Sequence, residues 1–356
     1  MKPEDFYKEK GGSFEAVCPI TSRYVKGKTI RGNRPKTISK SRPLPETCDE
    51  LFCPGNEFKQ SPEILRIDGK KIKSFLMPNE MDSSWDARVF SNLYNGDLNP
   101  RITGLSNEWK NKYLETEEGK KHIRDLKSKL NPIPNDNYFF DLSCVVITSR
   151  YCPYETGNSN SEYLRLELLA ALETRKIAHE EGFRYGSIFK NNGAMGGQTQ
   201  PHSHSQLFNY KQSSELGNLD KHKKIFGKYP EVLMNVGHKL AEDCGWIVYE
   251  DKNISIFTVP WEEYPGLWAI SLENKDTFDE INLNGFVAPF YDLLTKLISN
   301  GLGDFNFMLF DSFDTSYIQP HAKIVLRGTK TRGAYNILLG GENHPFTPKS
   351  LADKLK

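Results

Sequence analysis

The sequence predicts an α+β fold built from two similar halves. A group of strands, a long helix and a closing strand near a histidine occur twice along the chain. A polar stretch at residues 210–230 separates the two occurrences. Such a repeat indicates tandem duplication of one α+β unit, which buries one face of its sheet under helices. The predicted domains are therefore residues 1–213 and residues 214–356.

Turn signals and apolar runs define the elements of the first half. Residues 1–50 are basic and rich in proline, and we expect extended chain with short strands there. The Pro-Gly-Asn sequence after Cys53 predicts a turn at residues 53–57. Residues 105–135 are polar and rich in lysine, which indicates a surface insertion with one short helix. Clusters of β-branched and aromatic residues predict strands at residues 64–67, 86–90, 138–149 and 185–190.

A long helix is expected between the last two of these strands, over residues 161–182. Leucines recur at helical spacing from Leu164 and Leu168 onward, which predicts one apolar face. Ser161 is a suitable N-cap and Gly182 a suitable stop. In the second half, the same spacing predicts helices over residues 231–243 and 277–299. Apolar runs predict strands at residues 246–249, 254–259, 267–272, 305–310 and 322–326.

The composition gives no signal for nucleic acid or membranes. The formal net charge is +1, so no bulk charge attracts either partner. No run of about 18 apolar residues predicts a membrane-spanning helix, and the first residues lack the apolar core of a secretion signal. Six cysteines spread over 356 residues do not indicate a disulfide framework. We therefore expect a cytoplasmic protein.

The segment of residues 189–206, FKNNGAMGGQTQPHSHSQ, carries the strongest functional signal. In an extended chain, alternate side chains share a face, so His202, His204 and Gln206 would point the same way. A neutral imidazole is a good nucleophile towards phosphorus near pH 7. Backbone N–H groups of a glycine-rich turn can hold a phosphoryl oxygen. The segment therefore predicts chemistry on a phosphate ester or anhydride.

This segment resembles the active-site signature of the galactose-1-phosphate uridylyltransferase family, which reads approximately FENKGAAMGCSNPHPHGQ. That family is the nucleotidyltransferase branch of the histidine-triad superfamily. The resemblance implies two histidine-triad-like halves that form an antiparallel sheet flanked by helices. It also implies ping-pong transfer of a nucleoside monophosphate from a nucleoside diphosphate sugar to a sugar 1-phosphate, as in galactose metabolism. Family members are often dimers, so a homodimer is one option.

The resemblance assigns roles within the signature. His204 matches the histidine that becomes the covalent nucleotidyl-histidine, and Gln206 matches a residue that donates to a phosphoryl oxygen. Thr199 stands where the family has a phosphate-contacting serine. Asn191 matches a substrate-binding asparagine, although it could instead cap the turn, and Gly197 is a further binding candidate.

Segments outside the signature extend the resemblance. Arg31 and Arg34 match an R-x-x-R-P segment suited to a diphosphate, or are ordinary solvated charges. Asn92, which Leu93 follows, is the asparagine of a W-x-x-R-V-x-x-N strand that begins at Trp85. In the family this asparagine lies at the nucleobase, and the alternative is that Asn92 only terminates the strand. Arg88 of that strand could be purely structural. In the C-terminal half, the residues expected to bind the sugar phosphate or line the pocket are His321, Lys330, Tyr335 and Asn336.

The resemblance also implies structural zinc. Family members often use a C-x-x-C pair, a third residue after a strand, and the first histidine of the pair. The matching set here is Cys48, Cys53, Cys152 and His202, which would suit a closed tetrahedral site. The spacing of Cys48 and Cys53 departs from the family, so the alternative is free buried cysteines. A second metal site of some relatives is expected to be lost, because only His321 matches it.

Asn336 replaces a family glutamate that grips sugar hydroxyls, so the sugar need not be galactose. The acceptor could be a sugar 1-phosphate or inorganic phosphate, and the latter would make the protein a phosphorylase of a nucleoside diphosphate sugar or a dinucleoside polyphosphate. A nucleotide hydrolase would let water resolve the same intermediate. A silent nucleotide-binding protein would form no intermediate.

Overall fold

The protein is described by a computed structural model, which divides into two compact units. Unit 1 comprises Met1–Pro43, Asn191–Thr199 and Ser214–Lys356, and unit 2 comprises Leu44–Lys190 and Gln200–Ser213. The domain boundary predicted from the sequence stays a prediction. The structure describes residues 7–10, 13–18, 24–28, 52–57, 63–69, 71–76, 84–91, 115–117, 120, 142–148, 161–180, 185–198, 200, 202–210, 230–261, 266–275, 277–312, 319–327 and 346–356.

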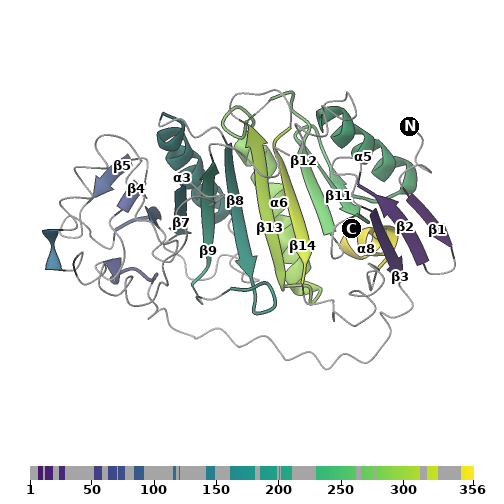
Figure 1. Ribbon diagram of the computed structural model, residues 1–356, viewed down its shortest axis with the longest axis horizontal. Helices are drawn as coiled ribbons and strands as arrows, with labels where there is room; N and C mark the ends of the chain where they lie inside the picture. The colour runs from purple at the N-terminus through teal and green to yellow at the C-terminus, as the bar shows by residue number, and fades with distance from the viewer. Residues whose placement is uncertain are drawn as a thin grey trace, which may run out of the picture. The chain divides into compact units, whose positions relative to one another are not determined.

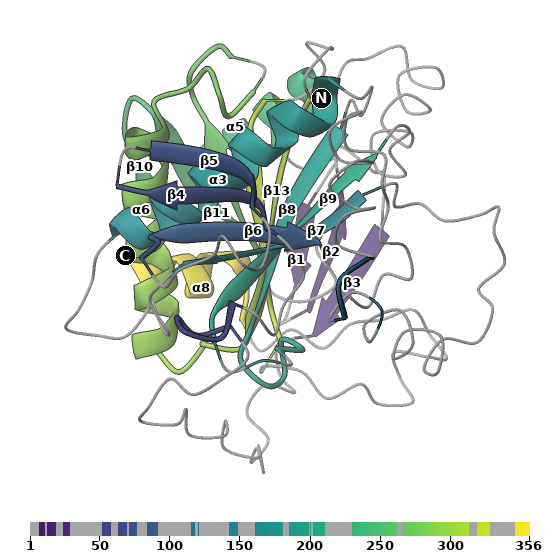
Figure 2. The same cartoon turned by 90° about the vertical axis from the view of Figure 1, so that its left-hand side faces the viewer.

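Unit 2 is an antiparallel sheet covered by one long helix (Figures 1 and 2). Its strands lie in the order β5-β4-β6-β7-β9-β8, and helix α3 (Ser161–Glu180) contacts four of them, β4, β6, β7 and β9. Strand β8 runs to Asn192, but its last two residues are grouped with unit 1. The strand bounds are Glu63–Asp68 (β4), Lys71–Leu76 (β5), Ala87–Ser91 (β6), Leu142–Thr148 (β7), Tyr185–Asn192 (β8) and His204–Tyr210 (β9).

Helix α3 confirms the predicted apolar face. Leu164, Leu168 and Leu172 are buried, as their helical spacing requires. The same face also buries Glu167 and Arg175, so charged groups interrupt the apolar stripe. Unit 2 therefore has a core that contains ionised side chains, and these need partners within it.

A second buried ionic group lies in the sheet of unit 2. Glu63 of β4 pairs with Arg66 of the same strand and with Arg88 of β6, and all three side chains are fully buried. Arg88 also lies over the ring of Trp85. These contacts favour the structural alternative for Arg88 that the sequence left open.

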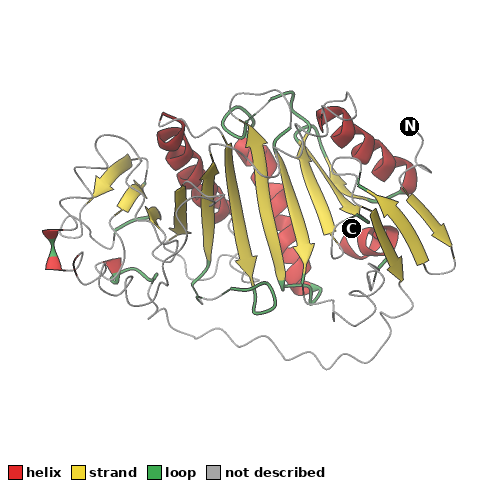
Figure 3. Ribbon diagram, in the orientation of Figure 1, coloured by secondary structure: helices red, strands yellow, loops and turns green. Residues whose placement is uncertain are grey.

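Unit 1 contains the sheet order β10-β11-β12-β14-β13, again antiparallel throughout, and a separate sheet of β1, β2 and β3. Helices α5 (Pro230–Cys244), α6 (Leu283–Ser299) and α8 (Pro348–Leu355) accompany these strands (Figure 3). The strand bounds are Tyr7–Lys10 (β1), Ser13–Val17 (β2), Tyr24–Lys28 (β3), Ile247–Glu250 (β10), Ile254–Val259 (β11), Gly266–Ser271 (β12), Phe305–Ser312 (β13) and His321–Leu326 (β14).

Helix α6 starts later than the sequence predicts. The spacing of apolar residues predicts a start at residue 277, but Asn282 is the N-cap and its side chain accepts from the Gly285 N–H. Residues before it form a turn, in which the Glu280 N–H donates to the Thr277 carbonyl at 3.2 Å and the Phe278 N–H donates to Asp311 at 2.7 Å. Phe290 then packs edge-on against Phe307 of β13, with ring centroids 5.4 Å apart. A side-chain cap therefore fixes the helix start.

Two elements were not predicted. Strand β5 is short and carries alternating lysines. Helix α8 starts at Pro348, and its N-cap Thr347 forms a reciprocal capping pair with Ser350 of the first turn. The short helix predicted within residues 105–135 falls mostly outside the described residues. The other predicted helices and the strands predicted from residue 64 onward are found, which confirms the α+β class with antiparallel sheets flanked by helices. None of the helices in the described part of the chain is long and apolar enough to cross a membrane.

Candidate functional site

His204 opens strand β9, where it pairs with Ile147 of β7. Its Nδ1 lies 2.9 Å from the carbonyl oxygen of His202, and the ring is 7% exposed. A carbonyl can only accept, so Nδ1 must carry the proton and Nε2 must carry the lone pair. The ring of Phe52 stands edge-on to the imidazole at 5.2 Å. Backbone and aromatic packing thus fix both the tautomer and the orientation of this histidine.

Burial keeps His204 neutral. Removal from water is the largest influence on its pKa and lowers it from the ordinary value, while the hydrogen bond to the His202 carbonyl raises it. The positive charge of Lys190 lowers the pKa further and the negative charge of Glu167 raises it. The net result is a lowered pKa, so the nucleophilic, unprotonated form prevails at neutral pH.

Lys190 and Glu167 form a buried ion pair that the sequence reasoning missed. The Lys190 ammonium lies 2.9 and 3.0 Å from the two Glu167 oxygens, and both side chains are 1% exposed. Two signals could have found it. Glu167 interrupts the apolar face of the predicted helix, and Lys190 reverses the charge of the glutamate in the family signature.

Gln206 lies two residues beyond His204 on the same strand, opposite Val145 of β7 and Phe189 of β8. The pleat therefore places its side chain on the same face as His204. Gln206 is half-buried. The structure thus brings an imidazole and a carboxamide to one face of β9.

His202 is fully buried just before β9. Its Nε2 lies 2.9 Å from the Thr148 carbonyl oxygen, so Nε2 carries the proton and Nδ1 has the lone pair. That Nδ1 lies 3.5 Å from Cys53 Sγ. A tetrahedral zinc about 2.0 Å from nitrogen and about 2.3 Å from sulfur would hold those atoms about 3.5 Å apart. Burial lowers the pKa of His202 to about 4, so Nδ1 is available as a ligand.

Cys53 sits in a well-defined turn. The Asn56 N–H donates to the Cys53 carbonyl at 3.1 Å, which confirms the predicted turn. Glu57 closes it by accepting from the Gly55 N–H at 2.9 Å and from the Trp85 indole at 2.6 Å. In the structure the Cys53 sulfur is disulfide-bonded. A disulfide and a thiolate ligand are alternative states of this sulfur, and the spacing to His202 fits the second.

The glycine-rich turn, residues 191–198, is anchored within unit 1. Asn192 donates to the Gly303 carbonyl at 2.6 Å, and the Met195 N–H donates to Asp304 at 2.9 Å. A Cβ at Gly196 would clash with the carbonyl oxygens of Asn192 and Phe305. Gly197 has a φ of +86°, which favours glycine. The turn therefore requires its glycines for conformation and for close packing.

His321 repeats the geometry of His204 at the start of β14. Its Nδ1 lies 3.0 Å from the carbonyl of Gln319, also two residues earlier, and its ring stacks on Phe310. Lys323, two residues on, places its ammonium 5.1 and 5.6 Å from the ring centres of Phe310 and Trp268. Histidines with the same local hydrogen bond thus begin a strand in each unit.

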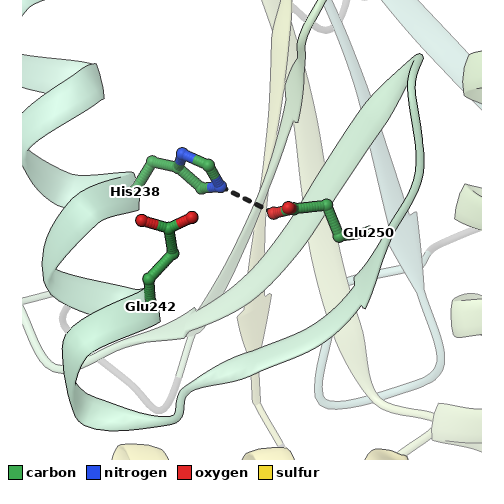
Figure 4. A group of neighbouring side chains, drawn as sticks. All are labelled: His238, Glu242 and Glu250. Carbon is green, nitrogen blue, oxygen red and sulfur yellow. Dashed lines mark hydrogen bonds and ion pairs between the residues drawn. The ribbon is translucent and has the colours of Figure 1, made fainter.

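Another group of potential metal ligands lies in unit 1 (Figure 4). His238 and Glu242 of α5 face Glu250 of β10, and the His238 Nε2 is 2.7 Å from a Glu250 oxygen. The remaining carboxylate, Glu242, accepts from Lys239 at 3.4 Å. The two glutamates are exposed, His238 is half-buried, and each side chain is already paired, so we interpret the group as a contact between α5 and β10.

The remaining predicted site residues lie outside the described part of the chain, and their assignments stay predictions. They are Arg31, Arg34, Cys48, Asn92, Leu93, Cys152, Thr199, Lys330, Tyr335 and Asn336.

Comparison with known proteins supports the resemblance. No family model matches the chain. The sequence is 26% identical over 194 residues to ADP-glucose phosphorylase of Arabidopsis thaliana, a match that covers 53% of this chain and 46% of that protein. The matched segment thus spans about half the length of this curated relative.

Solved structures match over nearly the whole chain. The crystal structure of an Arabidopsis thaliana ADP-glucose phosphorylase with bound ADP-glucose covers 97% of this chain and 98% of its own, with a TM-score of 0.63 and 20% identity. A uridylyltransferase structure covers 96% of this chain and 97% of its own, with a TM-score of 0.56 and 18% identity. The chain has the fold of the galactose-1-phosphate uridylyltransferase family. The uridylyltransferase-like fold predicted from the signature is therefore confirmed.

Proposed function

We propose that this uridylyltransferase-like protein transfers a nucleoside monophosphate from a nucleoside diphosphate sugar through His204. The Nε2 lone pair attacks the α-phosphorus, the bond from that phosphorus to the bridging oxygen breaks, and sugar 1-phosphate leaves. An acceptor oxygen then attacks the same phosphorus and releases His204. The observation that carries the proposal is the hydrogen bond from Nδ1–H to the His202 carbonyl at 2.9 Å, which leaves Nε2 as the nucleophile.

For the acceptor, we propose inorganic phosphate, with ADP-glucose as the donor. The support is that an ADP-glucose phosphorylase matches this chain both in sequence and in fold. An oxygen of inorganic phosphate would then attack the phosphorus bound to His204, and the product released would be a nucleoside diphosphate. A sugar 1-phosphate acceptor is the second candidate, because a uridylyltransferase has the same fold.

The signature residues would support this chemistry by hydrogen bonding. Gln206 shares a strand face with His204, so its amide would donate to a phosphoryl oxygen. We retain the other substrate-binding assignments as proposals: Arg31, Arg34, Asn92, Leu93, Asn191, Gly197, Thr199, His321, Lys330, Tyr335 and Asn336.

A structural zinc would be held by His202 and Cys53, together with Cys48 and Cys152. The support is the spacing of 3.5 Å between His202 Nδ1 and Cys53 Sγ and the tautomer that leaves Nδ1 unprotonated. When bound, zinc would connect the turn that contains Cys53 to His202, just before β9, and hold the two together. Metal analysis of protein purified under reducing conditions should find about one zinc per chain. A stable disulfide with no zinc under those conditions would contradict this assignment.

The activity is tested by product analysis. The protein is incubated with ADP-glucose and inorganic phosphate, and glucose 1-phosphate and ADP are measured. Parallel reactions omit phosphate, replace it with galactose 1-phosphate, or use UDP-glucose. We expect repeated turnover only when an acceptor is present, at most one equivalent of glucose 1-phosphate per chain without it, and no product from His204→Ala. His238→Ala, a change outside the site, is the control and should retain activity. Repeated release of sugar phosphate without any acceptor, beyond one equivalent per chain, would instead indicate a hydrolase.

A further inference from the structure

Asn306 is a buried polar residue at the second position of the apolar strand β13. It is 8% exposed, and its neighbours Phe305 and Phe307 are fully buried. Its amide makes three hydrogen bonds. The Nδ2 donates to Asn191 Oδ1 and to the Gly196 carbonyl, both at 2.6 Å, and the Oδ1 accepts from Arg327 Nε. Buried polar groups need such partners, and these three bonds hold the amide in place.

The partners fix which way the Asn306 amide points. A guanidinium has no acceptor, so the group facing Arg327 must be the Asn306 oxygen. A carbonyl has no donor, so the group facing Gly196 must be the Asn306 nitrogen. Turning the amide over would set donor against donor and acceptor against acceptor. Asn306 is therefore locked in a single orientation by groups that cannot change their own polarity.

This orientation determines the polarity of Asn191. Because Asn306 donates to it, Asn191 must present its Oδ1 inward. Its Nδ2 is then left to donate elsewhere, and no acceptor for it lies among the described residues. Asn191 lies near the end of β8, where the glycine turn begins, and it is half-buried, so part of the residue is open to a ligand.

We propose that Asn306 is a positioning residue that makes Asn191 a hydrogen-bond donor towards a phosphoryl oxygen of the substrate. Arg327, Asn306 and Asn191 form a relay in which each donor fixes the direction of the next. The end of the relay offers N–H, which suits an oxygen that only accepts, as phosphoryl oxygens do. The inference rests on the proposed function, because it takes the substrate to be a nucleotide.

Asn306→Asp is the decisive variant. The carboxylate has the same shape and still accepts from Arg327, but it cannot donate to Asn191 or to the Gly196 carbonyl. Asn191 then turns over to donate inward to Asp, and its carbonyl faces the ligand. We expect the KM for the nucleoside diphosphate sugar to rise about 10- to 100-fold, the size expected when a donor to an anion becomes an acceptor. Asn284→Asp, the same change at an exposed position of α6, should leave the KM unchanged.

Ligand binding separates positioning from general damage. ADP and adenosine differ only in the phosphates, and their dissociation constants are measured by calorimetry. Asn306→Asp should raise the dissociation constant of ADP about 10- to 100-fold and leave that of adenosine unchanged. Equal affinity of ADP for this variant and the wild type would overturn the proposal, as would equal weakening of both ligands.

A second variant covers the case in which Asn306→Asp does not fold. Asn191→Asp keeps the oxygen that accepts from Asn306, so the turn stays intact, but the outward NH₂ becomes a carboxylate oxygen. This variant should likewise bind ADP more weakly and bind adenosine as the wild type does. An unchanged affinity for ADP would overturn the proposal. Failure of the proposed function is distinguishable, because wild-type protein would then bind ADP but form no product from any nucleoside diphosphate sugar.

Discussion

The buried Lys190–Glu167 pair gives the sharpest prediction about stability. Glu167→Gln keeps the shape of the side chain and removes its charge. The Lys190 ammonium, 1% exposed, would then be buried without the counter-charge of Glu167. Breaking a buried pair from one side costs about 3–5 kcal/mol of unfolding free energy, because the remaining charge stays desolvated.

Glu162→Gln is the matched control on the same helix. Its partner is Arg165, and the side chains of the pair are 28% and 45% exposed, so solvent screens the interaction. We expect this change to cost no more than about 1 kcal/mol. Urea unfolding of both variants, followed by circular dichroism, measures the difference. Equal midpoints for the two variants would refute the reasoning that the Lys190 charge depends on Glu167.

Three further predictions follow from the site and its supports. Burial lowers the pKa of His204 below the ordinary histidine value of about 6.5, so the unprotonated ring persists at pH values below about 6.5. The rate of intermediate formation should therefore fall only in more acidic solution, and a rate that is half-maximal at or above about pH 6.5 would contradict this. Gly196→Ala should destabilise the protein by about 1–3 kcal/mol, because its Cβ meets two carbonyl oxygens. Gly303→Ala is its control, because the nearest atom to the added Cβ there lies 3.5 Å away. Equal melting temperatures of the two variants would count against the packing argument. Asn282→Ala should cost about 1 kcal/mol through loss of the α6 cap, measured in urea, and no loss would show that the cap does not fix the helix start.

Local patterns predicted most of the fold. The spacing of Leu164, Leu168 and Leu172 was enough to place α3, because an amphipathic helix shows its buried face in the sequence. Strand β5 was missed because its exposed, alternating lysines carry no apolar run. Helix α8 was missed because it is short and depends on the capping pair of Thr347 and Ser350.

The candidate site was predictable only in part. The signature placed His204 and Gln206 on one strand face, because that relation is local to the chain. The partners that orient the site were not predictable. Glu167 reaches Lys190 across 23 positions and Asn306 reaches Asn191 across 115. The sequence marks Glu167 and Lys190 as unusual at their positions, but it does not show which residue each of them meets. The polarity of Asn191 follows from its partners and could come only from the structure.

The central claim is that His204 carries the nucleotide covalently. The most direct measurement is intact mass at neutral pH after mixing the protein with ADP-glucose or UDP-glucose without an acceptor, beside His204→Ala. The account predicts that the wild type gains the mass of one nucleoside monophosphate, that the variant does not, and that inorganic phosphate or a sugar 1-phosphate removes the added mass. An unmodified wild-type protein that still releases sugar 1-phosphate, or a modified His204→Ala variant, would contradict it.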